Sequence, residues 1–442
     1  MTSSFAENTL ITFVTRVLQL ISGIGTSVII ARVLGPEGKG VYSLVILFQA
    51  LVIGFTDFGI GPASVFYIGK KKYSIKEVFG ANVIFSISIG LFAVMLGMIV
   101  IFAFGNKIFP GVRTEYLFLI LILIPLWFFL NYIINILLGL QEIKQYNLMQ
   151  LSVSLIFLIL ITLSVLVHHL SIRTAIIALI ISNASVCIMV FCQAKRATDG
   201  LTFSLNKGII RDLFLYGIKN YLGNILSFFH YKIDMFLINI FLSPRAVGLY
   251  SIAVGLAEQT WVISASASIV LFARVASETN ENKLKEFTPL VYRNILVITL
   301  LVNILLFAIG HWLITLLYSE QFGDSVLPFQ ILLMGTLMMN AWRILANDLY
   351  GRGKPMLNTY ITAGAVALNT MLNIIFIPKL GIAGAAWASS ISYAIVLIAI
   401  TMVYGKVSGN RIRDIILIKA SDLRLYQQLI ISIKNRYLVP SK

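Results

Sequence analysis

The sequence predicts an all-α integral membrane protein with twelve transmembrane helices. Of its 442 residues, 59% are hydrophobic and only 12% are charged, whereas about 25% of the residues of a soluble domain are charged. The hydrophobic residues fall in runs long enough to cross about 30 Å of hydrocarbon as helices. A ten-residue turn near the N-terminus also recurs in the second half of the chain. These observations predict two six-helix bundles related by an internal duplication.

Short polar turns separate the twelve predicted helices, and no connection is long enough to hold a soluble domain. A shorter run, His311–Tyr318, is expected to lie at the membrane interface or to extend the ninth helix. The twelve runs cover residues 9–33, 41–67, 79–104, 114–139, 147–167, 172–193, 217–242, 247–275, 288–310, 326–350, 356–377 and 383–405.

The distribution of Lys and Arg predicts the orientation of these helices. With the N-terminus inside, most basic residues between Lys70 and Lys354 fall in inner connections, and the basic tail adds more. The outer turns hold fewer, among them Arg32, Lys39 and Arg245. By the positive-inside rule both termini are therefore expected to be cytoplasmic, in a multi-pass protein of the plasma (inner) membrane. This orientation explains the net charge of +16 better than nucleic-acid binding does, and we expect no nucleic-acid partner.

The duplication is carried by two similar turns. Residues 34–43, LGPEGKGVYS, and residues 242–251, LSPRAVGLYS, share Leu, Pro, Gly, Tyr and Ser at matching places. Because each repeat has six helices, the copies are expected to run in the same direction, and transporters of this kind bind substrate at the repeat interface. The predicted domains are an N-terminal bundle, 1–193, a cytoplasmic linker, 194–216, a C-terminal bundle, 217–405, and a basic cytoplasmic tail, 406–442.

The tail has two interpretations. Leu423, Tyr426, Ile430, Ile433 and Tyr437 recur at helical spacing after Ser421 and Asp422. This pattern is typical of an amphipathic helix lying on an anionic membrane surface. A disordered basic tail remains the alternative.

No pattern of catalytic or metal-binding residues is present in the sequence. His168 and His169 have no acidic or Cys neighbour, and Cys187 and Cys192 lie in one apolar run, which suits neither a disulfide framework nor a zinc site. We therefore expect no catalytic residue, no metal and no cofactor, and predict that the protein is not an enzyme.

Charged residues inside the apolar runs are the candidate functional residues, because ionised groups near the centre of a bilayer are costly and usually face a partner or an aqueous cavity. Six of them are the candidates, and salt bridges that fix helix packing, or snorkelling of Arg16 and Arg343, are the alternative explanation. The basic ones are Arg16, Lys232 and Arg343, and the acidic ones are Asp57, Asp234 and Glu258.

The repeated motifs resemble those of a known family. Residues 34–42, LGPEGKGVY, followed by Asp57-Phe58-Gly59-Ile60-Gly61, are similar to the opening of the Wzx-like polysaccharide flippases. Lys232-x-Asp234 with Ser243-Pro244-x-x-x-Gly248-Leu249-Tyr250 resembles the start of that family's second half. The resemblance covers nearly the whole chain. It implies membership of the multidrug/oligosaccharidyl-lipid/polysaccharide exporter superfamily, two bundles forming a V, and alternating access.

The resemblance also implies a function. Such flippases move an undecaprenyl-pyrophosphate-linked oligosaccharide, such as an O-antigen, capsule or exopolysaccharide repeat unit, to the outer leaflet, next to other polysaccharide assembly proteins. Arg16, Lys232 and Arg343 would then bind the anionic substrate. Asp57, Asp234 and Glu258 would form a charge network or hold a coupling proton or sodium ion. A cation-coupled multidrug exporter of the same superfamily is the alternative, and a membrane-embedded polysaccharide polymerase is a more distant one.

Overall fold

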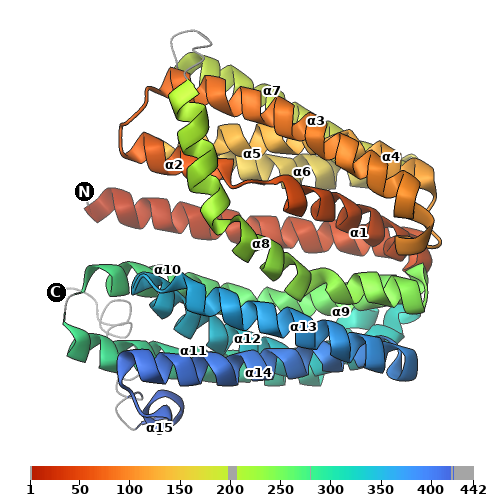
Figure 1. Cartoon of the computed structure of the whole chain (residues 1–442). Coiled ribbons are helices and arrows are strands. Elements are labelled where there is room, and N and C mark those ends of the chain that lie inside the picture. Colours follow the sequence, from red (N-terminus) through yellow and green to blue (C-terminus); the bar gives the residue numbers. More distant parts are fainter. Residues whose placement is uncertain (1, 198–206, 279, 420–421, 423–442) are drawn as a thin grey trace, which may run out of the picture. The chain divides into compact units, whose positions relative to one another are not determined.

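The computed structural model describes residues 2–197, 207–278, 280–419 and 422, and throughout them the chain is built of helices without strands. The described residues form two compact units (Figure 1). Unit 1 comprises Met1–Ser251 and Ile314–Gly323, and unit 2 comprises Ile252–Leu313 and Asp324–Lys442. The first unit therefore takes in the start of the second predicted repeat. The predicted repeat boundaries themselves stay predictions, and part of the predicted linker, 198–206, lies outside the described residues, as does most of the predicted tail helix.

Unit 1 is a bundle in which α5 packs on α2, α3, α6 and α7. α1 packs on α6, α3 packs on α5, and α8 packs on α1, α2 and α3. Several elements begin or end at recognisable signals, as in the capping box that Ser74 and Glu77 form at the start of α3. The helices are α1 Thr2–Thr56, α2 Ile60–Gly69, α3 Ile75–Ile108, α4 Thr114–Leu121, α5 Leu123–Gly139, α6 Ile143–Leu166, α7 Ile172–Ala197, α8 Lys207–Phe241 and the first part of α9, Pro244–Ala257.

Glycine and proline interrupt the long helices of unit 1. α1 is broken at Gly35, whose φ of 67° and ψ of −178° suit glycine almost alone, and Pro36 opens the second segment with a φ already suited to a helix. The predicted fourth helix is divided into α4 and α5 at Ile122. Pro125 explains this division, because it has no N–H to donate to the Leu121 carbonyl.

Unit 2 is a second helical bundle. α12 packs on α10 and α14, and α13 packs on α14. Its core includes the fully buried side chains of Tyr404, Ile344 and Leu349. The elements are η1 Glu258–Thr260, α10 Trp261–Ser277, α11 Glu281–Tyr318, η2 Glu320–Ser325, α12 Val326–Gly351, α13 Pro355–Leu380, α14 Ile382–Ser408 and α15 Ile412–Ile416. α11 runs on to Tyr318, so the short run after His311 extends the ninth predicted helix.

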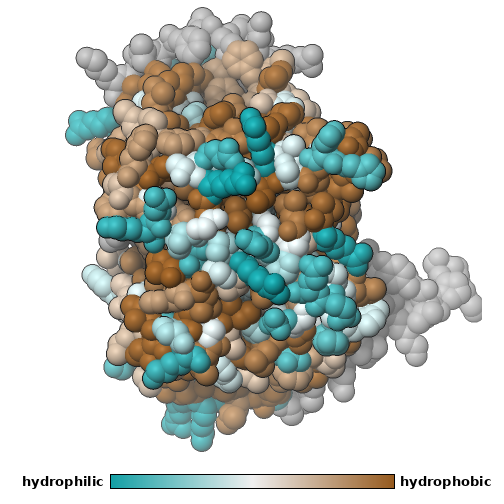
Figure 2. Space-filling model, turned by 90° about the vertical axis from the view of Figure 1, so that its right-hand side faces the viewer, coloured by the Kyte–Doolittle hydropathy of each residue, from teal (hydrophilic) through white to brown (hydrophobic). Residues whose placement is uncertain are grey.

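Membrane-length helices are confirmed, whereas the count of twelve stays a prediction. Ten helical segments within the described residues are long and apolar enough to cross a membrane. One of them, Leu10–Thr56, has 47 residues and contains the break at Gly35, so it covers two of the predicted runs. Large hydrophobic side chains such as Phe102, which is 78% exposed, lie on the surface, as expected for contact with lipid. Figure 2 shows a face on which hydrophilic residues are grouped among hydrophobic ones.

Candidate functional site in the interior of unit 1

The first segment of α1 presents a polar face to the interior of unit 1. Gln19, Ser22, Gly23, Thr26, Ser27 and Ile30 are three or four residues apart, so they share one face over about 16 Å of helix. Ser22 and Thr26 are buried. Apolar side chains would suffice if this face only packed against its neighbours. The hydroxyls and the amide therefore mark it as the wall of a polar space.

Two cavities lie along this face. The one here called the amide cavity has a volume of about 340 Å³ and is walled by α1, α5, α6 and α7, with Gln19, Asn131, Gln150 and Asn183 as its amide side chains. The one called the hydroxyl cavity measures about 200 Å³ and is lined by Ser22, Thr26, Ser27, Tyr42 and Lys39, among others. Ser154 of α6 lines both cavities. Their walls therefore join within one bundle.

Lys39 is a functional candidate that the sequence analysis missed. It was expected in an outer turn, but the structure places it in the second helical segment of α1, where it is only 8% exposed. Its ammonium lies 5.8 Å from the centre of the Tyr42 ring. Pro36 was the available signal: a proline that opens a helix places the residue three positions later inside that helix.

Asp57 lines a third cavity, of about 420 Å³, together with Gln49, Trp127 and Phe228. Trp127 also lines the amide cavity. The run predicted over 41–67 is interrupted here, because α1 ends at Thr56 and α2 begins at Ile60. Asp57 lies in the break between them, where Oδ1 accepts hydrogen bonds from the Tyr132 hydroxyl and from the backbone N–H of Gly59, both at 3.3 Å.

Close backbone contact with α8 supports this break. A Cβ at Gly217 would lie 2.1 Å from the Phe58 carbonyl oxygen, and one at Gly59 would lie 2.9 Å from the Gly217 carbonyl oxygen. The Tyr221 hydroxyl donates to the Phe55 carbonyl oxygen. Small residues allow this approach, as they do between many membrane helices. Asp57 is thus held where α1, α2 and α8 meet.

Asp234 has a partner that sequence reasoning did not identify. Its buried carboxylate accepts a hydrogen bond of 2.6 Å from the Tyr250 hydroxyl, and one of 2.7 Å from its own neighbour, the backbone N–H of Met235. His230, one helical turn earlier on α8, is also buried. Tyr250 is the tyrosine of the second copy of the repeated turn, and that repetition could have drawn attention to it.

The remaining predicted residues are distributed over both units. Arg16 is exposed on α1, one turn before Gln19, and Lys232 is half-buried on α8; both belong to unit 1. Glu258 and Arg343 belong to unit 2. Glu258 lies in the 3-10 turn η1 rather than inside a helix as predicted, because the backbone changes to a 3-10 turn between α9 and α10.

Arg343 contacts the residue that follows this turn. Its Nη1 donates to the Trp261 carbonyl oxygen at 3.3 Å, and the guanidinium lies 5.4 Å from the centre of the Trp261 ring. The stacking favours an oriented cation over a freely moving one. The substrate-binding role of Arg16, Lys232 and Arg343 stays a prediction.

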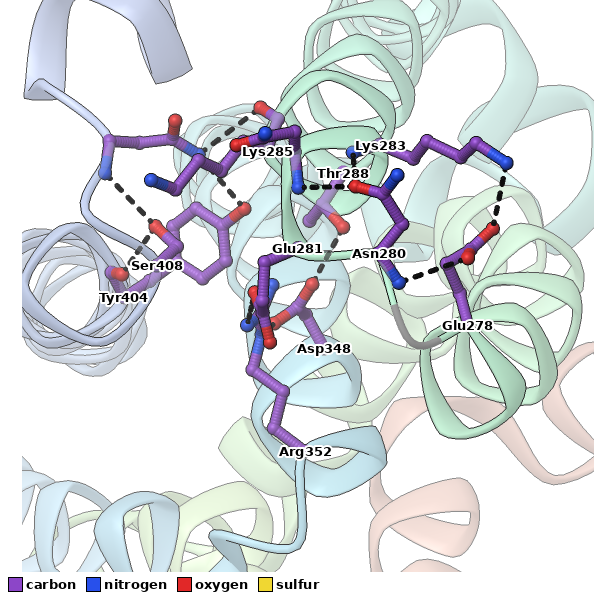
Figure 3. Close-up of polar contacts among 12 residues, drawn as sticks. Glu278, Asn280, Glu281, Lys283, Lys285, Thr288, Asp348, Arg352, Tyr404 and Ser408 are labelled. Atoms are coloured by element: carbon purple, nitrogen blue, oxygen red, sulfur yellow. Dashed lines mark hydrogen bonds and ion pairs between the residues drawn. The ribbon is translucent and has the colours of Figure 1, made fainter.

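Unit 2 has a second group of charges, which holds the ends of its helices together (Figure 3). Asp348 of α12 is fully buried and accepts a hydrogen bond of 2.6 Å from the Thr288 hydroxyl of α11. Arg352, one turn after Asp348, pairs with it and with Glu281 at the start of α11, the latter at 2.7 Å. Because these groups satisfy one another across helices, we assign them a structural role.

Comparison with known proteins identifies relatives in glycan biosynthesis. The sequence model of a family described as "Polysaccharide biosynthesis protein" matches residues 29–327. The "Probable low-salt glycan biosynthesis flippase Agl15" of Haloferax volcanii is 26% identical over 190 residues, which span 42% of this chain and 40% of that flippase. The "Uncharacterized membrane protein MJ1068" of Methanocaldococcus jannaschii is 26% identical over 396 residues, or 81% of this chain and 76% of that protein.

Solved structures of transporters share the fold. The lipid II flippase MurJ in an inward closed conformation superposes with a TM-score of 0.74 at 16% identity, covering 99% of this chain and 93% of MurJ. An inward-facing multidrug resistance transporter of the MATE family, in the MOP superfamily, gives a TM-score of 0.72 at 18% identity, with 90% and 95% covered. At such identities the likeness shows the fold, which confirms the predicted superfamily architecture. The matched proteins include flippases and transporters, which also supports the prediction that the chain is not an enzyme. The chain has the fold of the MOP transporters and belongs to the polysaccharide biosynthesis protein family.

Proposed function

We propose that this protein is a flippase that moves an undecaprenyl-pyrophosphate-linked oligosaccharide from the cytoplasmic to the outer leaflet by alternating access. The observation that carries the proposal is the polar face of α1, which lines two adjoining cavities inside a bundle of membrane-length helices. Family membership and the glycan-flippase relative support the same conclusion.

The chemistry of the substrate requires such an interior. The polyprenyl tail of a lipid-linked sugar can remain in the hydrocarbon, but its sugar hydroxyls and phosphates lose their hydrogen bonds if they leave water without replacement. A wall of amides and hydroxyls replaces those bonds, and cations offset the cost of desolvating the phosphates. Unit 1 offers both kinds of group on one helix, from Arg16 to Lys39.

We assign roles to the charged residues on this basis. Arg16, Lys232 and Arg343 bind the anionic part of the substrate, with Arg favoured for bidentate phosphate contact. Asp57, Asp234 and Glu258 form the charge network that couples transport to a proton or sodium ion. Asp57 is the favoured coupling site, because it lines a cavity of about 420 Å³ and lies in the break between α1 and α2.

The orientation and surroundings follow from the same proposal. Both termini are cytoplasmic, in the plasma (inner) membrane, and other polysaccharide assembly proteins deliver and receive the substrate. A cation-coupled multidrug exporter remains the alternative function, since the MATE transporters share this fold. The two differ in cargo, because an exporter of cationic drugs gains nothing from Arg16 and Lys39.

Deletion of the gene in its own cell tests the proposal. We expect lipid-linked oligosaccharide to accumulate, while the surface glycan disappears and resistance to cationic dyes is unchanged. The intact gene should restore the glycan. Loss of dye resistance with a normal surface glycan would instead establish the exporter.

A further inference from the structure

Hydrogen-bonding groups in the amide cavity match sugar hydroxyls. Asn131 and Asn183 each donate one amide proton to the backbone carbonyl four residues earlier, Trp127 and Leu179, at 2.9 Å. A primary amide has two protons and a carbonyl with two lone pairs. Each side chain is therefore anchored to its own helix and keeps both a donor and an acceptor. Sugar hydroxyls need this combination, because each of them also donates and accepts.

The position of these amides makes a ligand site a better explanation than helix packing alone. Trp127, Asn131 and Ile134 of α5 are spaced by four and three residues, as are Gln150, Ser154 and Phe157 of α6, and all six line the two cavities. Two helices thus each turn one face that carries amide or hydroxyl groups, Asn131 on α5 and Gln150 and Ser154 on α6, toward the polar face of α1. The volume of about 340 Å³ also falls in the range of about 300–1,000 Å³ typical of small-molecule sites.

The hydroxyl cavity has a different character, because it contains a cation. The Ser22 and Thr26 hydroxyls donate to the carbonyl oxygens of Leu18 and Ser22, both at 2.8 Å, so their own oxygens remain as acceptors. Lys39 is buried beside them. In the part of the chain that the structure describes, no acidic side chain forms an ion pair with it.

A buried cation with no anion beside it is costly, and an anionic ligand offsets that cost. Lysine suits this purpose as a compact charge with three donors. The acceptors around it meanwhile remain available to hydroxyl groups of the same ligand. The ligand with both properties is a sugar that carries an anionic group.

We propose that the two cavities form one binding site for an anionic sugar derivative, with the sugar among the amides and the anionic group on Lys39. This inference rests on the proposed function, and it adds a specific substrate contact that the six charged residues predicted from the sequence do not include. The anion is either the phosphate that joins sugar to lipid or the carboxylate of an acidic sugar, and both would bind the same ammonium.

Equilibrium binding to the purified full-length protein in lipid nanodiscs tests the site. The probes are glucose 1-phosphate, glucuronate and uncharged glucose. Lys39→Met should weaken the binding of glucose 1-phosphate or glucuronate at least tenfold, while the affinity for glucose stays within twofold of the parent value. Lys39→Arg should retain most of the affinity for the anionic probes. Whichever anionic probe loses more affinity identifies the source of the anion. Asn131→Leu should weaken the binding of all three probes.

Lys107→Met is the matched control, because Lys107 is an exposed lysine on α3 of the same unit; it should bind every probe like the parent protein. The Lys39→Met protein should also melt at a higher temperature when no ligand is present, since a buried charge has been removed. Unchanged affinity of Lys39→Met for both anionic probes would overturn the site even if transport is normal. Lys39-dependent binding in a protein that moves no lipid-linked sugar would leave the site standing and refute only the proposed function.

Discussion

The Ser43 hydroxyl donates a hydrogen bond of 3.2 Å to the Ser251 hydroxyl, and these serines occupy the same position in the two copies of the repeated turn. The preceding residues match in the same way within unit 1. A Cβ at Gly40 would lie 1.7 Å from the Pro244 carbonyl oxygen, and a Cβ at Gly248 would lie 1.9 Å from the Pro36 carbonyl oxygen. The two copies of the turn therefore pack against each other almost symmetrically.

This contact predicts that a methyl group at either glycine forces the two turns apart. Gly40→Ala and Gly248→Ala should each destabilise the protein by about 1–3 kcal/mol, the usual cost of overpacking, and lower the melting temperature in detergent. Gly255→Ala is the control on the same helix as Gly248, because a Cβ there meets nothing within 4 Å. Equal melting temperatures for Gly40→Ala and Gly255→Ala would show that the close packing is absent.

The buried ion pair between Asp348 and Arg352 in unit 2 predicts that removal of one charge strongly destabilises the protein. Asp348→Ala leaves Arg352 without its buried partner, and breaking a buried ion pair costs about 3–5 kcal/mol. Glu281→Ala removes the other partner of Arg352. The Glu281 side chain is 63% exposed, so we expect this change to cost less than about 1 kcal/mol. Thermal unfolding of both variants measures the two losses of stability. A milder effect of Asp348→Ala than of Glu281→Ala would contradict the structural role of the cluster.

Acid should loosen the contact between α11 and the segment after α15. Arg293 Nε and Nη2 bind the two carboxylate oxygens of Asp422 at 2.6 and 2.8 Å. This guanidinium holds the pKa of the Asp422 carboxyl below its usual value. The pair therefore stabilises the protein at pH above about 4, the ordinary Asp value, and the contribution is lost as pH falls through the lower pKa of the folded state.

The measurement is the melting temperature from about pH 6 to about pH 3, a range that brackets the ordinary Asp pKa. At about pH 6, the Asp422→Asn protein should melt at a lower temperature than the parent protein. Its melting temperature should also fall less on acidification. Parallel curves for the two proteins would exclude the pair as a source of the pH dependence.

Labelling tests the predicted orientation. In a background with Cys187→Ala and Cys192→Ser, single cysteines replacing Lys71 and Arg245 should react with a membrane-impermeant reagent from opposite sides, Lys71→Cys from the cytoplasm. The reason is the excess of Lys and Arg in the inner connections. Reaction of both from the same side would contradict the orientation and the helix count together.

The sequence predicted the membrane helices well because their signal is local: a run of apolar residues identifies itself without reference to the rest of the chain. Breaks were harder to place. Inside the predicted run 41–67, α1 ends at Thr56, because Gly59 adopts a left-handed conformation and packs on Gly217. That contact joins residues far apart in the sequence, which no local pattern encodes.

The candidate site was predicted only in part for a related reason. Charges inside apolar runs stand out, so Asp57 and Asp234 were found, and both prove to bind tyrosines. Lys39 was assigned to a turn because the helix-opening position of Pro36 was overlooked, and only the three-dimensional path after Gly35 shows that Lys39 lines a cavity. The amides of α5, α6 and α7 are common packing residues, and their shared cavity appears only when the helices are assembled.

Reconstituted flipping tests the central claim most directly. The protein is placed in liposomes with a fluorescent undecaprenyl-pyrophosphate oligosaccharide, and an impermeant quencher reports the fraction in the outer leaflet. We predict that the protein accelerates exchange between leaflets. Arg16→Ala and Lys232→Ala should reduce the rate at least tenfold, while Lys232→Arg keeps much of it. An exchange rate equal to that of protein-free liposomes, with transport of a cationic dye by the same vesicles, would contradict the proposed function.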